Sequence, residues 1–318
     1  MSRPNFFLIG APKCGTSAMA HYLGEHPGVV FAYPKEPYYW ADDFRGIQDR
    51  FGIRTLSKYE ALFQDATPKT VAAGEGSTIY LASSCAVERI LQYQPDAKFI
   101  VMLRNPVDMV VSAHLQELSH LNECERDFQT AWTLQESRAA GHQLPRDCYE
   151  PKLLQYRDMA RLGSQVERLL RTVSRAQVHV IFFEDFQRDL RSVYRGVLRF
   201  LQLEDDGRSE FLRINEAKVP RIRWMTKLLN GPGGTAVSRF LKRRLPGPVR
   251  NLGDRVKKFL TTQRVVRKPL PSALSERLRR EFADEIRLLE SCTGRDLSEW
   301  LTAPAGNHAR SMSGVPEP

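Results

Sequence analysis

A short apolar run followed by a glycine-containing loop is the feature that most constrains the fold of this chain. Residues 5–10 (NFFLIG) have the continuous apolar character of a buried strand. The loop Gly10-Ala-Pro-Lys-Cys-Gly15 follows, and Thr16 or Ser17 is expected to cap a helix that runs to about Glu25. In such a unit, backbone N–H groups of the loop and the helix N-terminus attract an anion. The chain is therefore predicted to contain a phosphate-binding cradle.

The position of the lysine in this loop restricts the kind of anion site. The spacing from Gly10 to Gly15 is that of a nucleotide triphosphatase loop, which requires a Lys directly after the second glycine. Here Thr16 occupies that place, and Lys13 lies inside the loop. The pattern argues against an ordinary nucleotide triphosphatase and indicates a different phosphate ligand.

Further apolar runs alternate with helical patterns along the chain. Strands are predicted at residues 29–32, 98–103 and 178–183. Helices are predicted at residues 84–93, 106–119, 152–173, 189–201 and 275–292, with short helices within 41–70 and near 128–137. This alternation predicts an α/β fold with a parallel sheet covered by helices on both faces. One domain is expected over residues 1–302, followed by a disordered tail at 303–318.

The net charge of +10 is concentrated in one segment. Residues 213–270 hold 16 Lys or Arg against two acids, a net charge of +14. This basic segment is interpreted as a lid or excursion that faces an anionic partner: nucleotide phosphates, an acidic glycan or an anionic membrane surface. A solvated basic loop is the alternative. Nucleic acid is not an expected partner.

Cysteine usage and hydropathy bear on the cellular compartment. The five cysteines are scattered, and no pair has the spacing of metal ligands. We therefore expect neither a disulfide framework nor a metal site. No run of 18 apolar residues occurs, and the first apolar run is too short for a signal peptide. A cytoplasmic protein is expected.

A second candidate anion site follows the strand at residues 98–103. Arg104 ends this strand, and Ser112 lies eight residues later. Arginine offers a planar fork of donors to a phosphate. Pro106 suits the first position of a helix, so Ser112 would lie two turns into that helix and could converge with Arg104 on one anion. The alternative is a structural salt bridge at Arg104 and a surface serine.

Together these motifs resemble the sulfotransferases that use PAPS (3′-phosphoadenosine-5′-phosphosulfate), in particular bacterial members related to heparan-type glycan sulfotransferases. The resemblance covers roughly residues 5–300 and implies a P-loop-like, three-layer α/β/α fold with a mainly parallel sheet of about five strands. It implies that Arg104 and Ser112 bind the 3′-phosphate, and that Lys13 stabilises the leaving phosphate oxygen. The implied 5′-phosphosulfate loop comprises Lys13, Cys14, Gly15, Thr16 and Ser17, with no chemistry assigned to Cys14.

Two further segments resemble the acceptor side of that family. Residues 33–39 (YPKEPYY) are similar to its Lys-Glu-Pro-His-Phe-Phe stretch, which makes Glu36 the general base and places Lys35 near the sulfuryl group or the acceptor. Tyr38 stands where that stretch has His. Residues 74–80 (GEGSTIY) are similar to its Glu-Lys-Ser-Pro-x-Tyr stretch, with Gly for Lys and Thr for Pro. Glu75 would assist the base, orient the acceptor or be a structural carboxylate.

Two weaker assignments complete the candidate site. Small-molecule sulfotransferases use a histidine base, so His114 is the alternative to Glu36. Residues 215–223 (NEAKVPRIR) resemble the late segment that closes over the adenine and the 3′-phosphate, with Lys218 and Arg221 as binding residues and Arg223 as a weaker candidate.

The predicted activity is transfer of the sulfuryl group from PAPS to a hydroxyl of a glycan, glycolipid or secondary metabolite, giving PAP and a sulfate ester. No metal is expected, because cationic side chains would do the work of Mg²⁺. A P-loop kinase or NTPase, and a non-catalytic basic binding protein of the same fold, are the alternatives. The sequence predicts neither the acceptor nor the oligomeric state.

Overall fold

The computed structural model describes residues 3–51, 53–212, 218–220, 262–264 and 270–302. Contacts within the chain separate two compact units. The first comprises Met1–Val111, Gln155–Asn215 and Pro269–Pro318, and the second comprises Ser112–Leu154 and Glu216–Lys268. Most of the basic segment 213–270 and the predicted tail lie outside the described residues.

The first unit is built on a five-stranded sheet in which every neighbouring pair is parallel. Its strand order is β2-β3-β1-β4-β5. β1 and β4 are buried at every position except Lys98, and their register places Phe6 opposite Lys98 and Gly10 opposite Met102. The predicted α/β fold with a parallel sheet of five strands is confirmed. The strands are β1 (Phe6–Gly10), β2 (Val29–Phe31), β3 (Ala72–Glu75), β4 (Lys98–Leu103) and β5 (Val178–Phe182).

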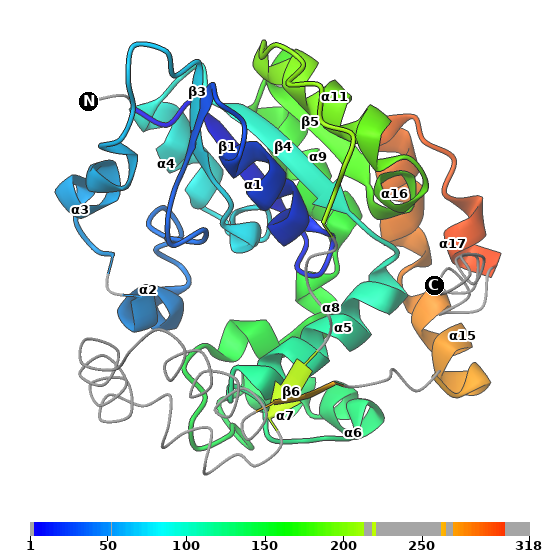
Figure 1. Ribbon diagram of the computed structural model, residues 1–318. Helices are drawn as coiled ribbons and strands as arrows, with labels where there is room; N and C mark the ends of the chain where they lie inside the picture. The colour runs from blue at the N-terminus through cyan, green and yellow to red at the C-terminus, as the bar shows by residue number, and fades with distance from the viewer. Residues whose placement is uncertain (1–2, 52, 213–217, 221–261, 265–269, 303–318) are drawn as a thin grey trace, which may run out of the picture. The chain divides into compact units, whose positions relative to one another are not determined.

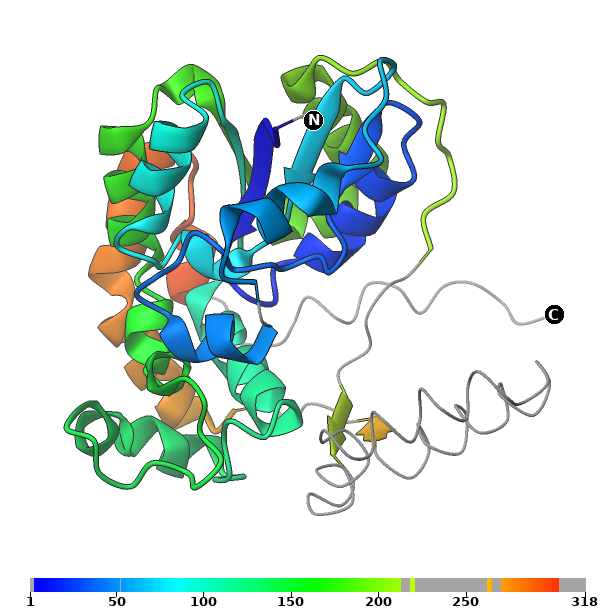
Figure 2. The same cartoon turned by 90° about the vertical axis from the view of Figure 1, so that its left-hand side faces the viewer.

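Helices cover both faces of this sheet (Figures 1 and 2). On one face lie α1 (Thr16–Gly24) and α11 (Leu190–Leu201), and on the other lie α4 (Ala86–Tyr93), α9 (Leu162–Thr172) and α16 (Ala283–Thr293). Among the described residues, no helix combines the length and the apolar character needed to cross a membrane. The remaining helices of the unit are α2 (Arg45–Phe51), α3 (Leu56–Glu60), η1 (Ala61–Phe63), η2 (Thr78–Tyr80), α8 (Tyr156–Met159), η4 (Arg175–Gln177), α10 (Phe183–Arg188), α15 (Ser272–Glu281) and α17 (Ser298–Thr302).

Two long predicted helices are interrupted. The segment 152–173 forms η3 (Pro151–Leu154), α8 and α9. The restart at Leu162 places Gly163 in the first turn of α9, where α16 approaches so closely that a Cβ would lie 2.2 Å from the carbonyl oxygen of Glu285. The segment 275–292 was predicted as one helix but is divided between α15 and α16 at Phe282, whose side chain is buried.

The structure also differs from the sequence analysis at the start of α1 and in one inner strand of the sheet. Neither Thr16 nor Ser17 caps α1; the capping position is Gly15, whose backbone is left-handed with a φ of 87°. The strand β3 was not predicted, because its sequence AAGE lacks the branched and aromatic residues typical of strands.

The second unit contains the last part of α5 (Pro106–Ser119), with α6 (Phe128–Thr133), α7 (Gln135–Ala139), η3 and an antiparallel pair of strands. These strands are β6 (Lys218–Pro220) and β7 (Thr262–Arg264). Its interior holds a buried ion pair in which Arg138 donates to both carboxylate oxygens of Glu123, at 2.6 and 2.8 Å. Asn122 donates to Glu117 and to the carbonyl of Glu150.

Candidate active site

The segments that follow β1, β2, β3 and β4 lie at the carboxyl edge of the sheet. The chain leaves β1 toward α1 on one face, whereas it leaves the neighbouring β3 toward α4 on the other (Figures 1 and 2). Open parallel sheets bind their ligands at such a switch in direction. Lys13 follows β1, Glu36 follows β2, and Arg104 follows β4, so the fold brings the three predicted segments to this edge.

The loop after β1 has the backbone of an anion cradle. Lys13 and Gly15 both have left-handed backbones, with φ of 68° and 87°. Such turns direct successive N–H groups toward one point, and the first N–H groups of α1 add to them. Gly10 is required at the start of the loop, because a Cβ there would lie 2.5 Å from the carbonyl oxygen of Met102. The geometry therefore suits the phosphate-binding role predicted for residues 13–17.

Cys14 is fully buried in this loop. Its Sγ lies 3.5 Å from the carbonyl oxygen of Pro12. Burial raises the pKa of the thiol, so it stays protonated at neutral pH and is a poor nucleophile. A packing role is consistent with the absence of any chemistry assigned to it.

Arg104 extends from the end of β4 toward the same loop. Its guanidinium stacks on the ring of Phe183 at 4.7 Å, with Nη1 3.5 Å from the carbonyl oxygen of Lys13 and Nη2 3.6 Å from the carboxylate of Asp108. Both polar contacts are long, so the planar donor fork could turn to a phosphate. Ser112 is buried on α5 and belongs to the second unit, and its joint action with Arg104 stays a prediction.

Glu36 is surrounded by hydrogen-bond donors. Lys35 Nζ donates to Glu36 Oε1 at 2.6 Å, while the hydroxyls of Tyr38 and Thr78 donate to Oε2, the latter at 3.3 Å. Burial raises the pKa of this carboxyl, but the charge of Lys35 and these hydrogen bonds outweigh it, and the pKa lies below its ordinary value. The side chain remains 24% exposed. Glu36 is therefore an ionised, accessible carboxylate, as a general base requires.

Lys35 links this carboxylate to the anion loop. The same Nζ that bonds Glu36 also donates to Thr16 Oγ1 at 3.3 Å. Thr16 is the first residue of α1 and is itself buried. One ammonium group thus touches both the candidate phosphate cradle and the candidate base.

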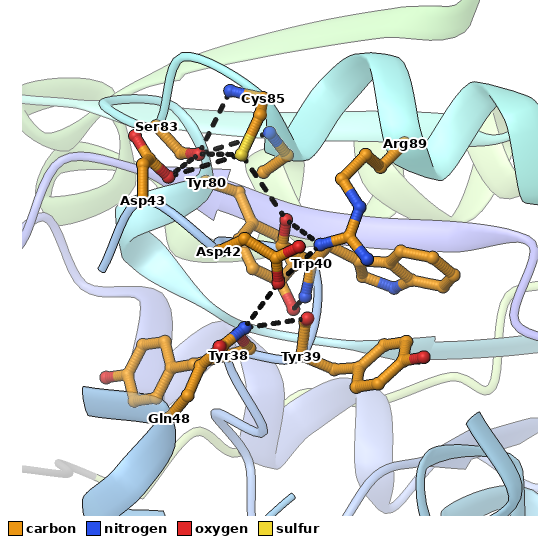
Figure 3. Close-up of polar contacts among 11 residues, drawn as sticks. Tyr38, Tyr39, Trp40, Asp42, Asp43, Gln48, Tyr80, Ser83, Cys85 and Arg89 are labelled. Atoms are coloured by element: carbon orange, nitrogen blue, oxygen red, sulfur yellow. Dashed lines mark hydrogen bonds and ion pairs between the residues drawn. The ribbon is translucent and has the colours of Figure 1, made fainter. Parts of the chain in front are cut away.

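The segment after Glu36 is fixed to the start of α4 (Figure 3). Asp43 accepts hydrogen bonds from the hydroxyl of Ser83 at 2.6 Å and from the backbone N–H of Ser84 at 3.0 Å. Arg89 donates to the carbonyl of Trp40 at 3.1 Å and pairs with Asp42 at 2.6 Å. The turn that carries the candidate base is therefore anchored on its far side.

Glu75 ends β3 beneath this turn. Its side chain is fully buried, and it accepts hydrogen bonds from Tyr59 at 3.3 Å and from the backbone and hydroxyl of Ser77 at 3.0 and 2.5 Å. Burial raises its pKa to about 7. Ser77 Oγ in turn accepts the backbone N–H of Tyr38 at 3.0 Å. Full burial favours the interpretation of Glu75 as a structural carboxylate.

The other predicted residues are not brought to this edge within the first unit. His114 belongs to the second unit, where it is buried and its Nε2 lies 2.8 Å from the carbonyl oxygen of Glu125. Burial lowers its pKa. Lys218 lies in β6 opposite Arg264. Arg221 and Arg223 lie outside the described residues.

Sequence reasoning missed two residues of the site. Tyr38 and Thr78 both bond Glu36, yet they were noted only as departures from the family pattern. Their residue types could have indicated this role, because Tyr38 and Thr78 each have a hydroxyl group at a position where the family stretch has none. In the part of the chain that the structure describes, no cluster of His, Cys, Asp and Glu could hold a metal ion.

Comparison with known proteins identifies the family. Human carbohydrate sulfotransferase 15 is 31% identical over 163 residues, which are 39% of this chain and 29% of that protein. Human heparan sulfate glucosamine 3-O-sulfotransferase 6 is 32% identical over 116 residues, covering 36% of this chain and 31% of that protein. The chain thus spans less than a third of the length of either relative.

A solved structure and a family profile extend the likeness over most of the chain. The crystal structure of a sulfotransferase from Alicyclobacillus acidocaldarius is 28% identical, with a TM-score of 0.69 over 94% of this chain and 99% of that one. The model of the sulfotransferase family matches residues 4–207. The chain, with its anion loop after β1 and its carboxylate after β2, therefore belongs to the sulfotransferase family.

Proposed function

We propose that this sulfotransferase moves the sulfuryl group of PAPS to a hydroxyl group of a glycan, releasing PAP and a sulfate ester. The observation that carries the proposal is the position of Lys35, whose Nζ bonds both Thr16 in the anion loop and Glu36. In an in-line displacement, the attacking and leaving oxygens lie on opposite sides of the sulfur. A phosphate cradle and a base must therefore lie close together, and their shared contact with Lys35 supports this arrangement.

Each residue has a defined task in this displacement. Glu36 accepts the proton of the acceptor hydroxyl as the new O–S bond forms. Lys13 and the N-terminus of α1 stabilise the charge that grows on the 5′-phosphate oxygen as its bond to sulfur breaks. Arg104 offers its donor fork to the 3′-phosphate. The part assigned to Ser112 from the sequence stays a prediction. His114 stays the alternative base, but its burial and its contact with Glu125 favour Glu36.

The acceptor class is inferred from the relatives and from charge. Both human relatives named above are carbohydrate-modifying sulfotransferases by name. The segment 213–270, with its net charge of +14, would suit an anionic glycan through electrostatic attraction. Contact of this segment with an anionic membrane surface, and a glycolipid or secondary metabolite as acceptor, are the other outcomes of the test.

Labelled PAPS and a panel of acceptor classes test the proposal. We expect the label to appear in a glycan. Lys13→Ala should lower kcat/KM by about 10² to 10³-fold. Glu36→Gln should lose turnover while its affinity for PAP stays unchanged. Glu25→Gln is the matched control, because Glu25 follows the opposite end of α1. Wild-type turnover in Glu36→Gln would remove Glu36 as base, and Mg²⁺-dependent ATP hydrolysis without sulfuryl transfer would favour the NTPase alternative.

A further inference from the structure

We infer that Tyr38 is a positioning residue for the base: its phenol hydroxyl orients the Glu36 carboxylate and moderates its basicity. The inference rests on the proposed function in one respect, namely that Glu36 is the base. Within the described residues, Tyr38 and Thr78 share Oε2 of Glu36, while Lys35 holds Oε1. The carboxylate is therefore held at both oxygens.

The backbone of Tyr38 is built for this contact. Its φ of 54° lies in the left-handed region, which is unfavourable for a residue with a side chain and is kept only where the surroundings enforce it. Three hydrogen bonds hold this backbone conformation. The N–H of Tyr38 donates to Ser77 Oγ at 3.0 Å, and the carbonyl of Tyr38 accepts from Gln48 Nε2 at 3.2 Å and from the N–H of Ala41 at 3.3 Å. This turn folds the ring of Tyr38 back onto the residue two positions earlier.

The two oxygens of Glu36 are held by donors of different kinds. Lys35 is charged and is shared with Thr16, so the arrival of a negatively charged donor at the loop would compete for it. Tyr38 donates to the other oxygen through a phenol hydroxyl, and this residue belongs to the turn after β2. In the described part of the chain, the groups that contact the Glu36 carboxylate are Lys35, Tyr38 and Thr78, with Glu75 behind Ser77. The hydroxyl of Tyr38, together with the 3.3 Å contact of Thr78, is therefore placed to keep the carboxylate oriented during turnover.

Tyr38→Phe removes the hydroxyl and leaves the ring. Tyr39→Phe is the matched control, because the ring of Tyr39 stacks on Tyr59 at 4.9 Å, and Figure 3 shows the rings of Tyr38 and Tyr39 turned to opposite sides. The first measurement is a ¹³C NMR titration of the Glu36 carboxyl, assigned by its loss in Glu36→Gln. Glu36 should titrate at higher pH in Tyr38→Phe, because its carboxylate has lost a donor, and as in the wild type in Tyr39→Phe. An unchanged titration in Tyr38→Phe overturns the inference.

The second measurement is the pH profile of kcat/KM with PAPS and the acceptor. In Tyr38→Phe the acidic limb should move to higher pH, and the maximum should fall about 10- to 100-fold, since a hydrogen bond to a charged group is lost. The KM for PAPS should not change. If the maximum of kcat/KM falls but the acidic limb does not move, Tyr38 has a purely structural role, and the inference is overturned. Absence of PAPS-dependent transfer in the wild type refutes the proposed function instead, while the titration still decides whether Tyr38 controls Glu36.

Discussion

Replacing Glu75 by Gln tests whether the buried carboxyl group beneath the base is a structural support. Burial raises the pKa of Glu75 to about 7 from an ordinary value of 4.5, despite hydrogen bonds from Ser77 and Tyr59. The folded protein therefore keeps a proton at pH values where the unfolded chain has lost it. The stability that this group contributes is fully present below about pH 4.5 and is lost as the pH rises through about 7.

The size of the effect follows from these two pKa values. Between about pH 5 and about pH 8.5, proton linkage at Glu75 should lower the free energy of unfolding of the wild type by about 2.5 kcal/mol. A glutamine is neutral throughout this range. Its amide oxygen can accept both hydrogen bonds from Ser77, and its amide N–H can donate to the hydroxyl oxygen of Tyr59. Glu75→Gln should therefore keep the contacts and remove this part of the pH dependence.

Urea unfolding, followed by tryptophan fluorescence, measures the difference. The stability of Glu75→Gln relative to the wild type should rise by about 2.5 kcal/mol from about pH 5 to about pH 8.5, since other titrating groups cancel in the comparison. Glu88→Gln, at an exposed position of α4, should show no such rise. A relative stability that is the same at both pH values would refute the reasoning, because Glu75 would then be ionised in the folded protein at neutral pH.

Three further substitutions test the anion sites and the second unit. Arg104→Lys should weaken PAP binding about tenfold in calorimetry, because lysine keeps the charge but loses the donor fork and the stacking on Phe183; unchanged affinity would contradict a phosphate-binding role. Gly15→Ala should lower the free energy of unfolding in urea by about 1–2 kcal/mol and also weaken PAP binding, because the φ of Gly15 is 87° and a Cβ would lie 3.2 Å from Phe183 and Phe186. A variant as stable as the wild type would show that the loop can rearrange freely. Glu123→Gln should destabilise the protein by about 3–5 kcal/mol, because it leaves the Arg138 cation buried without its partner; a change below about 1 kcal/mol would mean that water reaches Arg138.

Short sequence patterns were sufficient to predict most strands of the sheet in the first unit. β1, β4 and β5 were predicted from runs of apolar residues, because strands covered on both faces need such residues throughout. The start of α5 was predicted from Pro106, and its end at Ser119 agrees with the prediction. The same approach did not predict β3, because this strand packs so tightly that it needs small residues. A Cβ on Gly74 would lie 2.5 Å from the carbonyl oxygen of Phe6.

The surroundings of Glu36 depend on strand pairing, which local patterns do not contain. Thr78 bonds Glu36 across 42 positions of sequence, and Ser77 bonds the backbone of Tyr38 across 39. Both contacts exist because β2 and β3 are parallel neighbours, with Phe31 opposite Gly74, so the segments that follow them leave the sheet side by side. A slip of one residue in this register would exchange the sheet faces to which alternate side chains of β3 point, and would displace Ser77 and Thr78 along the edge. The register of β3, a strand without an apolar signal of its own, thus determines which hydroxyl groups reach the base.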